Sequence, residues 1–219
     1  MSYLKTALTG AAVAIAATLA ASAAGAVTIV NGSFEIGNDP GSFSTLANGD
    51  NTSIFGWTVG GLGVDYIGSY WQAADGQRSI DLSGNNKGSI SQLLTGLSIG
   101  TTYRVDFSLA GNPDGGAATK VAVASDGGSQ TGVFAFSQAG NTKSDMGWER
   151  NTFQFVATDT TANLTFSSTL FDAYGPALDN VSISGGAVPE PATWAMMLVG
   201  FGGMGAMLRR RRAMLLSVA

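Results

Sequence analysis

Short runs of alternating hydrophobic and polar residues fill the middle of the chain. The clearest run is residues 102–109, in which Tyr103, Val105, Phe107 and Leu109 alternate with polar residues. A period of two with one apolar face is typical of a β-strand that buries one side. Seven similar runs are expected to form further strands, at residues 79–82, 89–94, 121–124, 133–136, 152–156, 163–166 and 177–183.

Clusters of Gly, Asn, Asp and Pro separate these runs and indicate turns, at residues 84–86, 112–116, 126–128 and 140–141. No stretch of the middle shows a helical period, and no internal repeat or linker divides it. Many short strands joined by polar turns predict an all-β fold, an antiparallel sandwich or barrel. Residues 27–187 are enough for one such domain with a core of its own.

The first 26 residues have the three parts of a secretory signal peptide. Lys5 gives a weakly positive start, an apolar run follows from Ala7 to Ala21, and residues 24–26 (Ala-Gly-Ala) match a cleavage site of the A-x-A type. The run is short and rich in alanine, which favours cleavage over the alternative of an uncleaved membrane anchor. We therefore expect export from the cytoplasm.

The C-terminal segment 188–219 also has three parts in a fixed order. A proline-stiffened Val-Pro-Glu-Pro stretch at 188–191 precedes 17 uncharged residues at 192–208 and a cluster of four arginines at 209–212. Seventeen helical residues span about 25 Å, near the lower limit for crossing a bilayer. Arginines stop transfer and stay in the cytoplasm, so the pattern predicts a transmembrane helix with the domain outside.

This order of motif, apolar segment and basic end resembles the PEP-CTERM sorting signal in its P-E-P-x-x-W-A variant. The residues that match are Pro189, Glu190, Pro191, Trp194, Ala195, Arg209, Arg210, Arg211 and Arg212. The resemblance implies that an exosortase, a membrane transpeptidase, cleaves the chain near the Pro-Glu-Pro. It also implies a Gram-negative host that makes exopolysaccharide, transient insertion in the inner membrane, and a mature protein at the cell surface or in the extracellular matrix. The seven residues after the arginines depart from the pattern.

Charge and missing residue types exclude several functions. Residues 27–187 hold six basic and fourteen acidic residues, a net charge of −8 that repels phosphate backbones, so nucleic acid is not an expected partner. The chain has neither Cys nor His, which excludes Ser-His-Asp and Cys-His nucleophile systems and the usual zinc sites. Paired carboxylates are the main catalytic device that remains, and no spacing selects such a pair.

The domain itself resembles the choice-of-anchor C family, whose domain is similar to one in plant cell-wall proteins. The segments that carry the resemblance are 31–35 (NGSFE), 88–92 (GSISQ), 100–103 (GTTY), 107–112 (FSLAGN), 153–155 (FQF, after Trp148) and 175–181 (GPALDNV). The resemblance covers nearly all of residues 27–185. It implies a galactose-binding-like jelly-roll β-sandwich, as in many carbohydrate-binding modules, but the fold alone does not fix a ligand.

A candidate metal site joins the two ends of the domain. Asp179 shares its strand register with Val181 and Ile183, which predicts that its carboxylate points inward and needs a partner. By resemblance to carbohydrate-binding modules, Glu35 and Asp179 would help to bind one structural calcium ion, with backbone carbonyls completing the shell. The alternative is that each carboxylate bonds to backbone amides in a turn or cap.

Aromatic residues in Gly- and Ser-rich stretches are the candidate sugar contacts, because sugars present flat C–H faces that pack on rings. The candidates are Trp57, Tyr66, Tyr70, Trp71 and Tyr174, with Asp65, Gln72 and Asp75 as polar partners. The alternative for the large aromatics is burial in the core, which is favoured for Trp148.

Three functions remain open from the sequence. The favoured one is a non-catalytic surface or matrix protein that binds polysaccharide or exopolysaccharide. The second is a purely structural matrix component without a specific ligand. The third is a glycan-active enzyme, which the missing His and the absent carboxylate pair disfavour.

Overall fold

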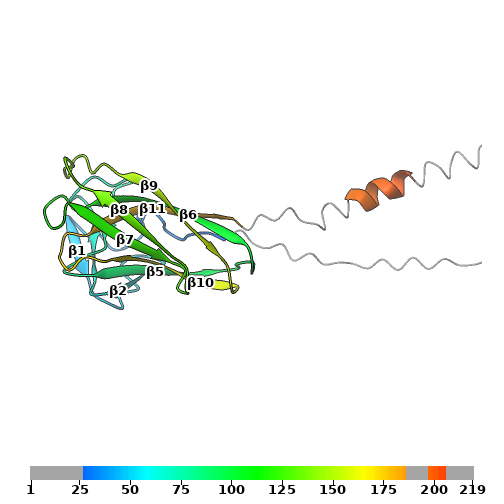
Figure 1. Cartoon of the computed structure of the whole chain (residues 1–219), viewed down its shortest axis with the longest axis horizontal. Coiled ribbons are helices and arrows are strands. Elements are labelled where there is room, and N and C mark those ends of the chain that lie inside the picture. The colour runs from blue at the N-terminus through cyan, green and yellow to red at the C-terminus, as the bar shows by residue number, and fades with distance from the viewer. Residues whose placement is uncertain (1–26, 186–196, 206–219) are drawn as a thin grey trace, which may run out of the picture. The chain divides into compact units, whose positions relative to one another are not determined.

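A computed structural model of the chain describes residues 27–185 and 197–205 (Figure 1). The strands are β1 Phe43–Leu46, β2 Thr58–Gly61, β3 Val64–Ile67, β4 Ser79–Asp81, β5 Gly88–Thr95, β6 Thr102–Gly111, β7 Thr119–Ser125, β8 Thr131–Ser137, β9 Glu149–Val156, β10 Thr161–Ser168 and β11 Pro176–Gly185. All of them lie in one compact unit, residues 24–187.

The strands form two antiparallel sheets that pack face to face. The six-stranded sheet has the order β1-β3-β4-β11-β6-β9, and the five-stranded sheet has the order β2-β5-β10-β7-β8. This arrangement confirms the predicted all-β antiparallel sandwich. The eight alternating runs of the sequence correspond to β4 through β11. The three short strands β1, β2 and β3 were not predicted, because four-residue strands in Gly-rich sequence show too few alternations to be recognised.

The core lies between the two sheets and is rich in aromatic rings. Phe107 of β6 contributes its ring from one sheet, and Phe166 of β10 and Phe134 of β8 contribute theirs from the other. The Phe107 ring centroid lies 5.0 Å from each of the other two, in edge-on contact. Such packing adds to the burial of the rings, which contributes about 1.5–3 kcal/mol for each fully buried side chain. Because the strands and the buried core of the described chain all lie within 27–185, this segment supplies its own core.

The closing strand β11 contains a bulge that shifts its alternation of inward and outward side chains. The pairing of β11 with β6 shifts register between Asp179 and Ser182, and Asn180 adopts a positive φ of 50°. Leu178 pairs with Leu109 on the core face of β6, so Asp179, which pairs with Ser108, points to the outer face of the sheet. The prediction that Asp179 shares the core-facing register of Val181 and Ile183 is therefore wrong, because the bulge shifts the alternation. Asp179 is nevertheless completely buried, and its carboxylate accepts hydrogen bonds from the backbone of Ala74 and Asp75.

The C-terminal unit is described only at residues 197–205, which form a short exposed helix. In the described ranges 27–185 and 197–205, no helix is both long and apolar enough to cross a membrane. The remainder of the expected membrane segment, the signal peptide 1–26, the Pro-Glu-Pro motif, Trp194, Ala195 and the four arginines lie outside the described residues. The transmembrane helix therefore stays a prediction.

Candidate functional site

A hollow of about 380 Å³ opens at the end of the sandwich where β1 lies, and several loops meet there. Its walls come from β1, β3, the loop after β3, the loop after β4, the loop between β6 and β7 and the loop before β11. The lining residues are Phe43, Thr45, Asp65, Ile67, Tyr70, Trp71, Gly84, Asn85, Asn112, Asp114, Ala173 and Tyr174. We call this feature the end hollow. The loops after β4 and β6 and the loop before β11 leave the sheet at one end, and the loop after β3 leaves at the other end and returns to meet them, as the bond from Tyr70 to Asp114 shows.

Three aromatic rings give the end hollow exposed apolar surface. Phe43 and Tyr174 are 45% and 38% exposed, which leaves their ring faces open to a ligand. Tyr70 packs edge-on against Phe43 with ring centroids 5.0 Å apart, and its hydroxyl donates a hydrogen bond to the Asp114 carboxylate. Partly exposed rings beside hydrogen-bonding groups are the combination that sugars require.

An ion pair fixes the rim of the end hollow next to Tyr70. The Lys143 ammonium lies 2.9 Å from Asp114 Oδ2 and 3.8 Å above the centre of the Tyr70 ring. Burial alone would raise the pKa of Asp114, but the hydrogen bonds from Tyr70 and Lys143 hold that pKa below its usual value. Asp114 is therefore an ionised acceptor at neutral pH.

The floor of the end hollow rests on a buried pair of aspartates. Asp65 of β3 and Asp81 of β4 are directly opposite each other in the strand pairing. Asp81 is fully buried; its Oδ2 accepts a hydrogen bond of 2.8 Å from the Asn112 side-chain amide, and its Oδ1 accepts one of 2.9 Å from the Ser83 backbone. Burial raises the pKa of Asp81 to about 8, and burial also raises the pKa of Asp65, whose Oδ1 accepts a bond from Thr45.

A buried lysine connects two loops behind the end hollow. Lys120 of β7 is completely buried, and its ammonium donates hydrogen bonds of 2.6 Å to the backbone carbonyls of Gly115 and Tyr174. Burial lowers the pKa of Lys120, which Asp172 and Asp81 partly counteract by their charges. Lys120 thus holds the 112–118 loop against the loop that carries Tyr174. The sequence does contain a signal for it, since Lys120 shares its face of the strand with Ala122 and Ala124.

The five predicted sugar contacts divide into two groups. The end hollow brings together Tyr70, Trp71 and Tyr174, although Trp71 is only 5% exposed and its indole N–H bonds to Ser79 Oγ. The structure corrects the expectation for Trp57 and Tyr66, which are each 1% exposed and belong to the core. Their polar atoms are used internally, because the Trp57 indole and the Tyr66 hydroxyl donate to backbone carbonyls of the 31–34 segment. Phe43, Asn112, Asp114 and Lys120 were not identified from the sequence.

Glu35 and Asp179, the two predicted calcium ligands, both accept hydrogen bonds from the backbone of the 74–78 loop. Glu35 Oε1 accepts hydrogen bonds from the backbone of Gln77 and Arg78, at 2.8 and 2.7 Å. Asp179 Oδ2 accepts bonds from the backbone of Ala74 and Asp75, at 2.8 and 2.9 Å, and its Oδ1 accepts one from Asn180. The first and last parts of the domain are therefore tied together through the 74–78 loop.

This arrangement fits calcium only in part. Three of the four oxygens of Glu35 and Asp179 already face amide hydrogens, while calcium takes six to eight oxygen ligands. Among the described residues, no group of three or more His, Cys, Asp or Glu is placed to hold a metal. A side chain at Gly76 (φ 69°) would meet Glu35 Oε1 at 2.4 Å, so the loop is shaped to approach the carboxylate closely. Loop anchoring by amide bonds accounts for the observed geometry, and calcium binding stays a prediction.

Two other hollows have fewer exposed rings beside acceptors. One of about 580 Å³ lies behind Trp71, on the other side of the 69–78 loop from the end hollow. Another of about 540 Å³ lies over β5, where the exposed apolar side chains of Val30, Phe55 and Leu93 surround it. The end hollow is the smallest of the three, but it combines three aromatic rings with carboxylate and amide groups.

Comparison with known proteins finds a matching family for the domain and a matching sorting motif for the C-terminal segment. A family model described as Protein of unknown function (DUF642) matches residues 27–184, and a model of the PEP-CTERM protein-sorting motif matches residues 187–212. The second match confirms the expected sorting signal, which marks an exported cell-surface protein. Halomucin from Haloquadratum walsbyi is 37% identical over 164 residues, which are 71% of this chain but 2% of halomucin. The chain thus spans a very small part of that relative.

Similar solved structures include sugar-binding modules. The structure of TmCBM61 in complex with β-1,4-galactotriose is 17% identical, with 70% of this chain and 94% of that chain covered and a TM-score of 0.43. The CBM22-1-CBM22-2 tandem domain from Paenibacillus barcinonensis Xyn10C is 21% identical, with 78% and 49% covered and a TM-score of 0.46. At TM-scores below 0.5, this likeness says nothing about what the chain binds. Since the DUF642 model matches most of the chain, the protein is an exported member of the DUF642 family that carries a PEP-CTERM sorting motif.

Proposed function

We propose that the domain is a non-catalytic saccharide-binding module that holds polysaccharide or exopolysaccharide at the cell surface. The observation that carries the proposal is the end hollow, where the exposed rings of Phe43 and Tyr174 and the partly buried ring of Tyr70 lie beside Asp114 and Asn85. Rings can pack on the C–H faces of a sugar, and carboxylate and amide oxygens can accept bonds from its hydroxyls. The hollow is open to solvent, so a chain longer than one sugar can extend out of it.

Sorting completes the proposed route of the protein. We expect an exosortase to cleave near Pro189, Glu190 and Pro191 after the apolar segment 192–208 enters the inner membrane of a Gram-negative cell. Removal of the tail would leave the domain free to act in the extracellular matrix. The sorting motif at residues 187–212 supports this route.

A glycan-active enzyme is the second candidate, because Asp65 and Asp114 both line the end hollow and their pKa values move in opposite directions. Burial raises the pKa of Asp65, while Tyr70 and Lys143 hold that of Asp114 low, which is the relation of a general acid to an ionised partner. We favour binding because both carboxylates already accept protein hydrogen bonds, from Thr45 and from Tyr70. A purely structural matrix component is the third candidate.

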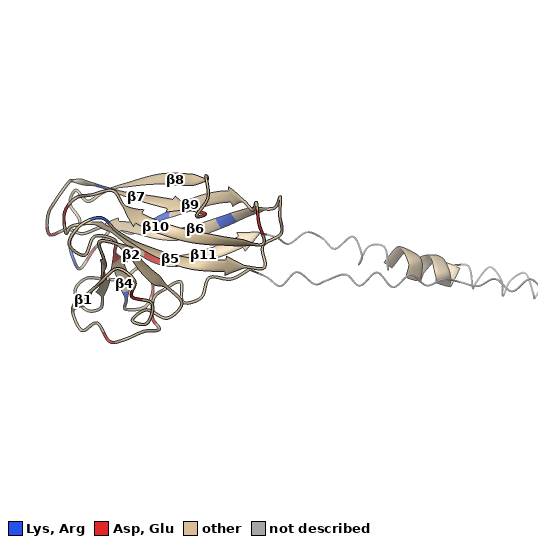
Figure 2. Ribbon diagram, turned by 90° about the horizontal axis from the view of Figure 1, so that it is seen from below, with Lys and Arg blue, Asp and Glu red and all other residues tan. Residues whose placement is uncertain are grey.

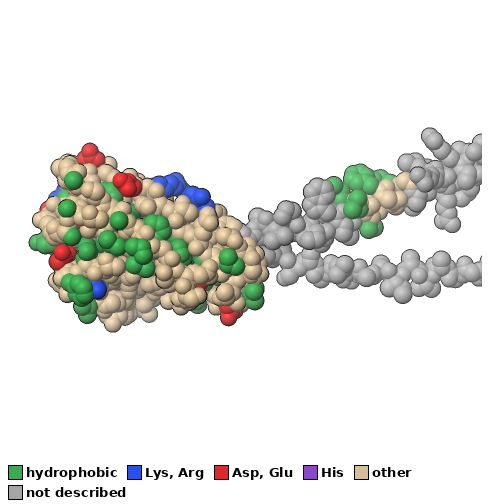
Figure 3. Space-filling view, in the orientation of Figure 1, with side chains coloured by type: hydrophobic (Ala, Val, Ile, Leu, Met, Phe, Trp, Pro, Cys, Tyr) green, Lys and Arg blue, Asp and Glu red, His purple; other side chains and the backbone are tan. Residues whose placement is uncertain are grey.

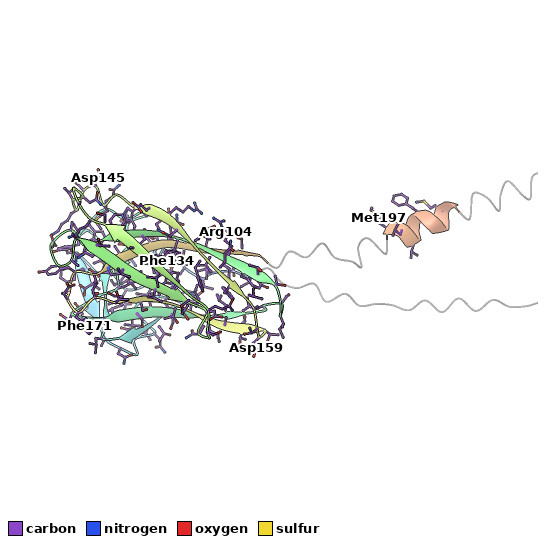
Figure 4. The ribbon with its side chains drawn as sticks, viewed as in Figure 1. Arg104, Phe134, Asp145, Asp159, Phe171 and Met197 are labelled. Atoms are coloured by element: carbon purple, nitrogen blue, oxygen red, sulfur yellow. The ribbon has the colours of Figure 1, made fainter. Side chains whose placement is uncertain are left out.

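One experiment separates the three. The purified domain, residues 27–187, is applied to a glycan array, and each sugar that binds is titrated by calorimetry and incubated to detect release of reducing ends. Tyr174→Ala should weaken binding by about tenfold or more, because one ring–sugar contact is lost. Phe171→Ala is the matched control, since Phe171 is an exposed ring (78%) on the same loop but outside the hollow (Figure 4).

Each outcome selects one candidate. Binding that Tyr174→Ala weakens and Phe171→Ala leaves intact, without release of reducing ends, supports the proposal. Release of reducing ends that Asp65→Asn or Asp114→Asn abolishes identifies the enzyme. Absence of binding to every glycan refutes the proposal and leaves the structural matrix component.

A further inference from the structure

The four edge strands of the two sheets differ in how well they are protected against pairing with another chain. Exposed edges carry unpaired backbone N–H and C=O groups, and natural proteins shorten them, charge them or cover them. β1 and β2 have four residues each, and β2 ends in two glycines. β9 carries Glu149 and Arg150, and its backbone at Val156 is occupied by the side chain of Gln130, which bonds to both its N–H and its C=O. Three of the four edge strands are therefore protected against pairing with another chain, β1 and β2 by their short length and β9 by its charges and by the bonds of Gln130.

β8 is neither short nor charged, and its edge is contacted only at its last residue, where the Asn141 side chain bonds to the Ser137 carbonyl. It is seven residues long, with the sequence TGVFAFS, and contains no charge and no proline. Figure 2 shows β8 along the border of its sheet without a charged residue over its length. The strand is held firmly from inside, because Phe136 is buried and Phe134 packs on Phe107. β8 is thus an uncharged edge strand whose inner face packs on the core.

The hydrogen bonds of β8 leave one set of backbone groups free. The ladder with β7 runs without a bulge from Thr119–Ser137 to Ser125–Thr131. Just beyond its two ends, Asp126 donates to the Gln130 carbonyl and Gln138 donates to the Ala118 carbonyl, so even-numbered residues point their backbone groups at β7. In an antiparallel ladder the alternate residues point away. The N–H and C=O groups of residues 131, 133, 135 and 137 therefore face the open edge, where the Ser137 carbonyl also accepts a hydrogen bond of 3.4 Å from the Asn141 side chain.

We propose that β8 pairs with β8 of a second copy of this chain and joins two five-stranded sheets into one. A two-fold antiparallel register centred on Phe134 places Thr131 opposite Ser137 and Val133 opposite Ala135. Both pairs whose backbone groups face outward then match in character, hydroxyl with hydroxyl and small apolar with small apolar, and their outward N–H and C=O groups find partners. This self-complementarity is what a two-fold interface between identical chains requires.

The net charge of the domain also favours this edge as the place where two copies can pair. Residues 27–187 carry a net charge of −8, so two copies repel each other wherever acidic residues meet. Figure 3 shows hydrophobic side chains over the region of β7 and β8 with no charged side chain among them. Val133 is 70% exposed there and would be covered by Ala135 of the second copy. The uncharged edge is where two acidic domains can approach at the lowest electrostatic cost.

The first test measures mass in solution. The domain 27–187 is run at increasing concentration with light-scattering detection, and a monomer–dimer equilibrium is expected. Ala135→Pro removes an outward N–H without touching the ladder with β7, and Val133→Lys puts a charge at the centre of the interface. Each should raise the dimer Kd by about ten- to a hundredfold. Leu93→Lys is the matched control: Leu93 is 63% exposed on the same face of the same sheet but away from the edge, and it should leave Kd unchanged.

The second test determines the register of the β8–β8 pairing by disulfide cross-linking. It is possible because the chain contains no cysteine of its own. Facing residues of a hydrogen-bonded pair have Cα atoms about 5.5 Å apart, within the range that a disulfide spans. A mixture of Val133→Cys and Ala135→Cys chains should form disulfide-linked dimers faster than either variant alone. Three results would overturn the proposal: a domain that stays monomeric at every concentration, a Leu93→Lys control that dissociates the dimer equally, or single variants that cross-link as fast as the mixture. Thermal unfolding of every variant confirms that it is folded before these results are compared.

Discussion

Asp81 makes the stability of the domain depend on pH in a direction opposite to that of most surface carboxylates. The side chain is fully buried beneath the end hollow, next to Asp65 and bonded to Asn112 and the Ser83 backbone. Burial penalises the charged form and raises its pKa from 3.8 to about 8. The folded domain therefore holds a proton on Asp81 at a pH where the unfolded chain has lost it.

The size of the effect follows from this shift. A carboxyl whose pKa is raised on folding contributes stability that is fully present below pH 3.8 and is lost as the pH rises through about 8. Within that window the free energy of unfolding changes by at most about 1.4 kcal/mol per pH unit. Raising the pH from 5 to 7 should thus lower it by about 2.7 kcal/mol, which corresponds to a fall in Tm of about 5–11 °C. Asp179, whose pKa burial raises to about 7, and Asp65 act in the same direction.

The assay is thermal unfolding of residues 27–187 between pH 5 and pH 8, for the wild type and for Asp81→Asn. The asparagine has nearly the same shape and cannot ionise, so the slope of Tm against pH should become shallower by the share that Asp81 contributes. Asp145→Asn is the control for loss of a carboxylate at an exposed position (Figure 4). Equal slopes for the wild type and Asp81→Asn would refute the reasoning, since Asp81 would then be ionised in the folded domain across the whole range.

Three further predictions concern the loop anchors and sorting. Lys120→Met should lower the free energy of unfolding by about 3 kcal/mol in denaturant titrations, because two charge-assisted hydrogen bonds are lost; an equal loss in the partly exposed Lys87→Met control would contradict this. If Glu35 and Asp179 share a calcium ion, excess chelator should lower Tm and Asp179→Asn should abolish that response, since a ligand at 100 times its Kd adds about 2.7 kcal/mol; a variant that is less stable but keeps the full response would mean loop anchoring only. Mass spectrometry of surface material should recover no peptide from residues 1–26 or 194–208, and recovery of the latter from the mature extracellular form would contradict exosortase cleavage.

The class of the fold and the export route of the protein could be predicted from linear patterns in the sequence. Alternation along β6 and its neighbours predicts half-buried strands, because successive side chains of an extended chain point to opposite faces. This property is local, so it can be recognised without knowing which strand is the partner. The same argument failed for Asp179, because the bulge in β11 shifts the alternation and places this side chain on the outer face of the sheet. The sorting signal is likewise a linear feature, since Pro189 to Ala195 and the arginines are recognised in order along the chain.

The residues of the candidate site could not be predicted from such patterns, because they come together through the three-dimensional fold. Tyr70, Asp114 and Tyr174 come from three loops far apart in sequence. Asp114 and Tyr174 lie at the end of the sheet where β6 finishes and β11 starts, and the long loop after β3 brings Tyr70 back to them. Composition could not separate Trp57, which fills the core, from Tyr174, which stays open to solvent, because both stand in Gly- and Ser-rich surroundings. The unprotected edge of β8 was also invisible, since a strand becomes an edge through the order of strands in the sheet. That order depends on long-range pairing, which no local pattern encodes.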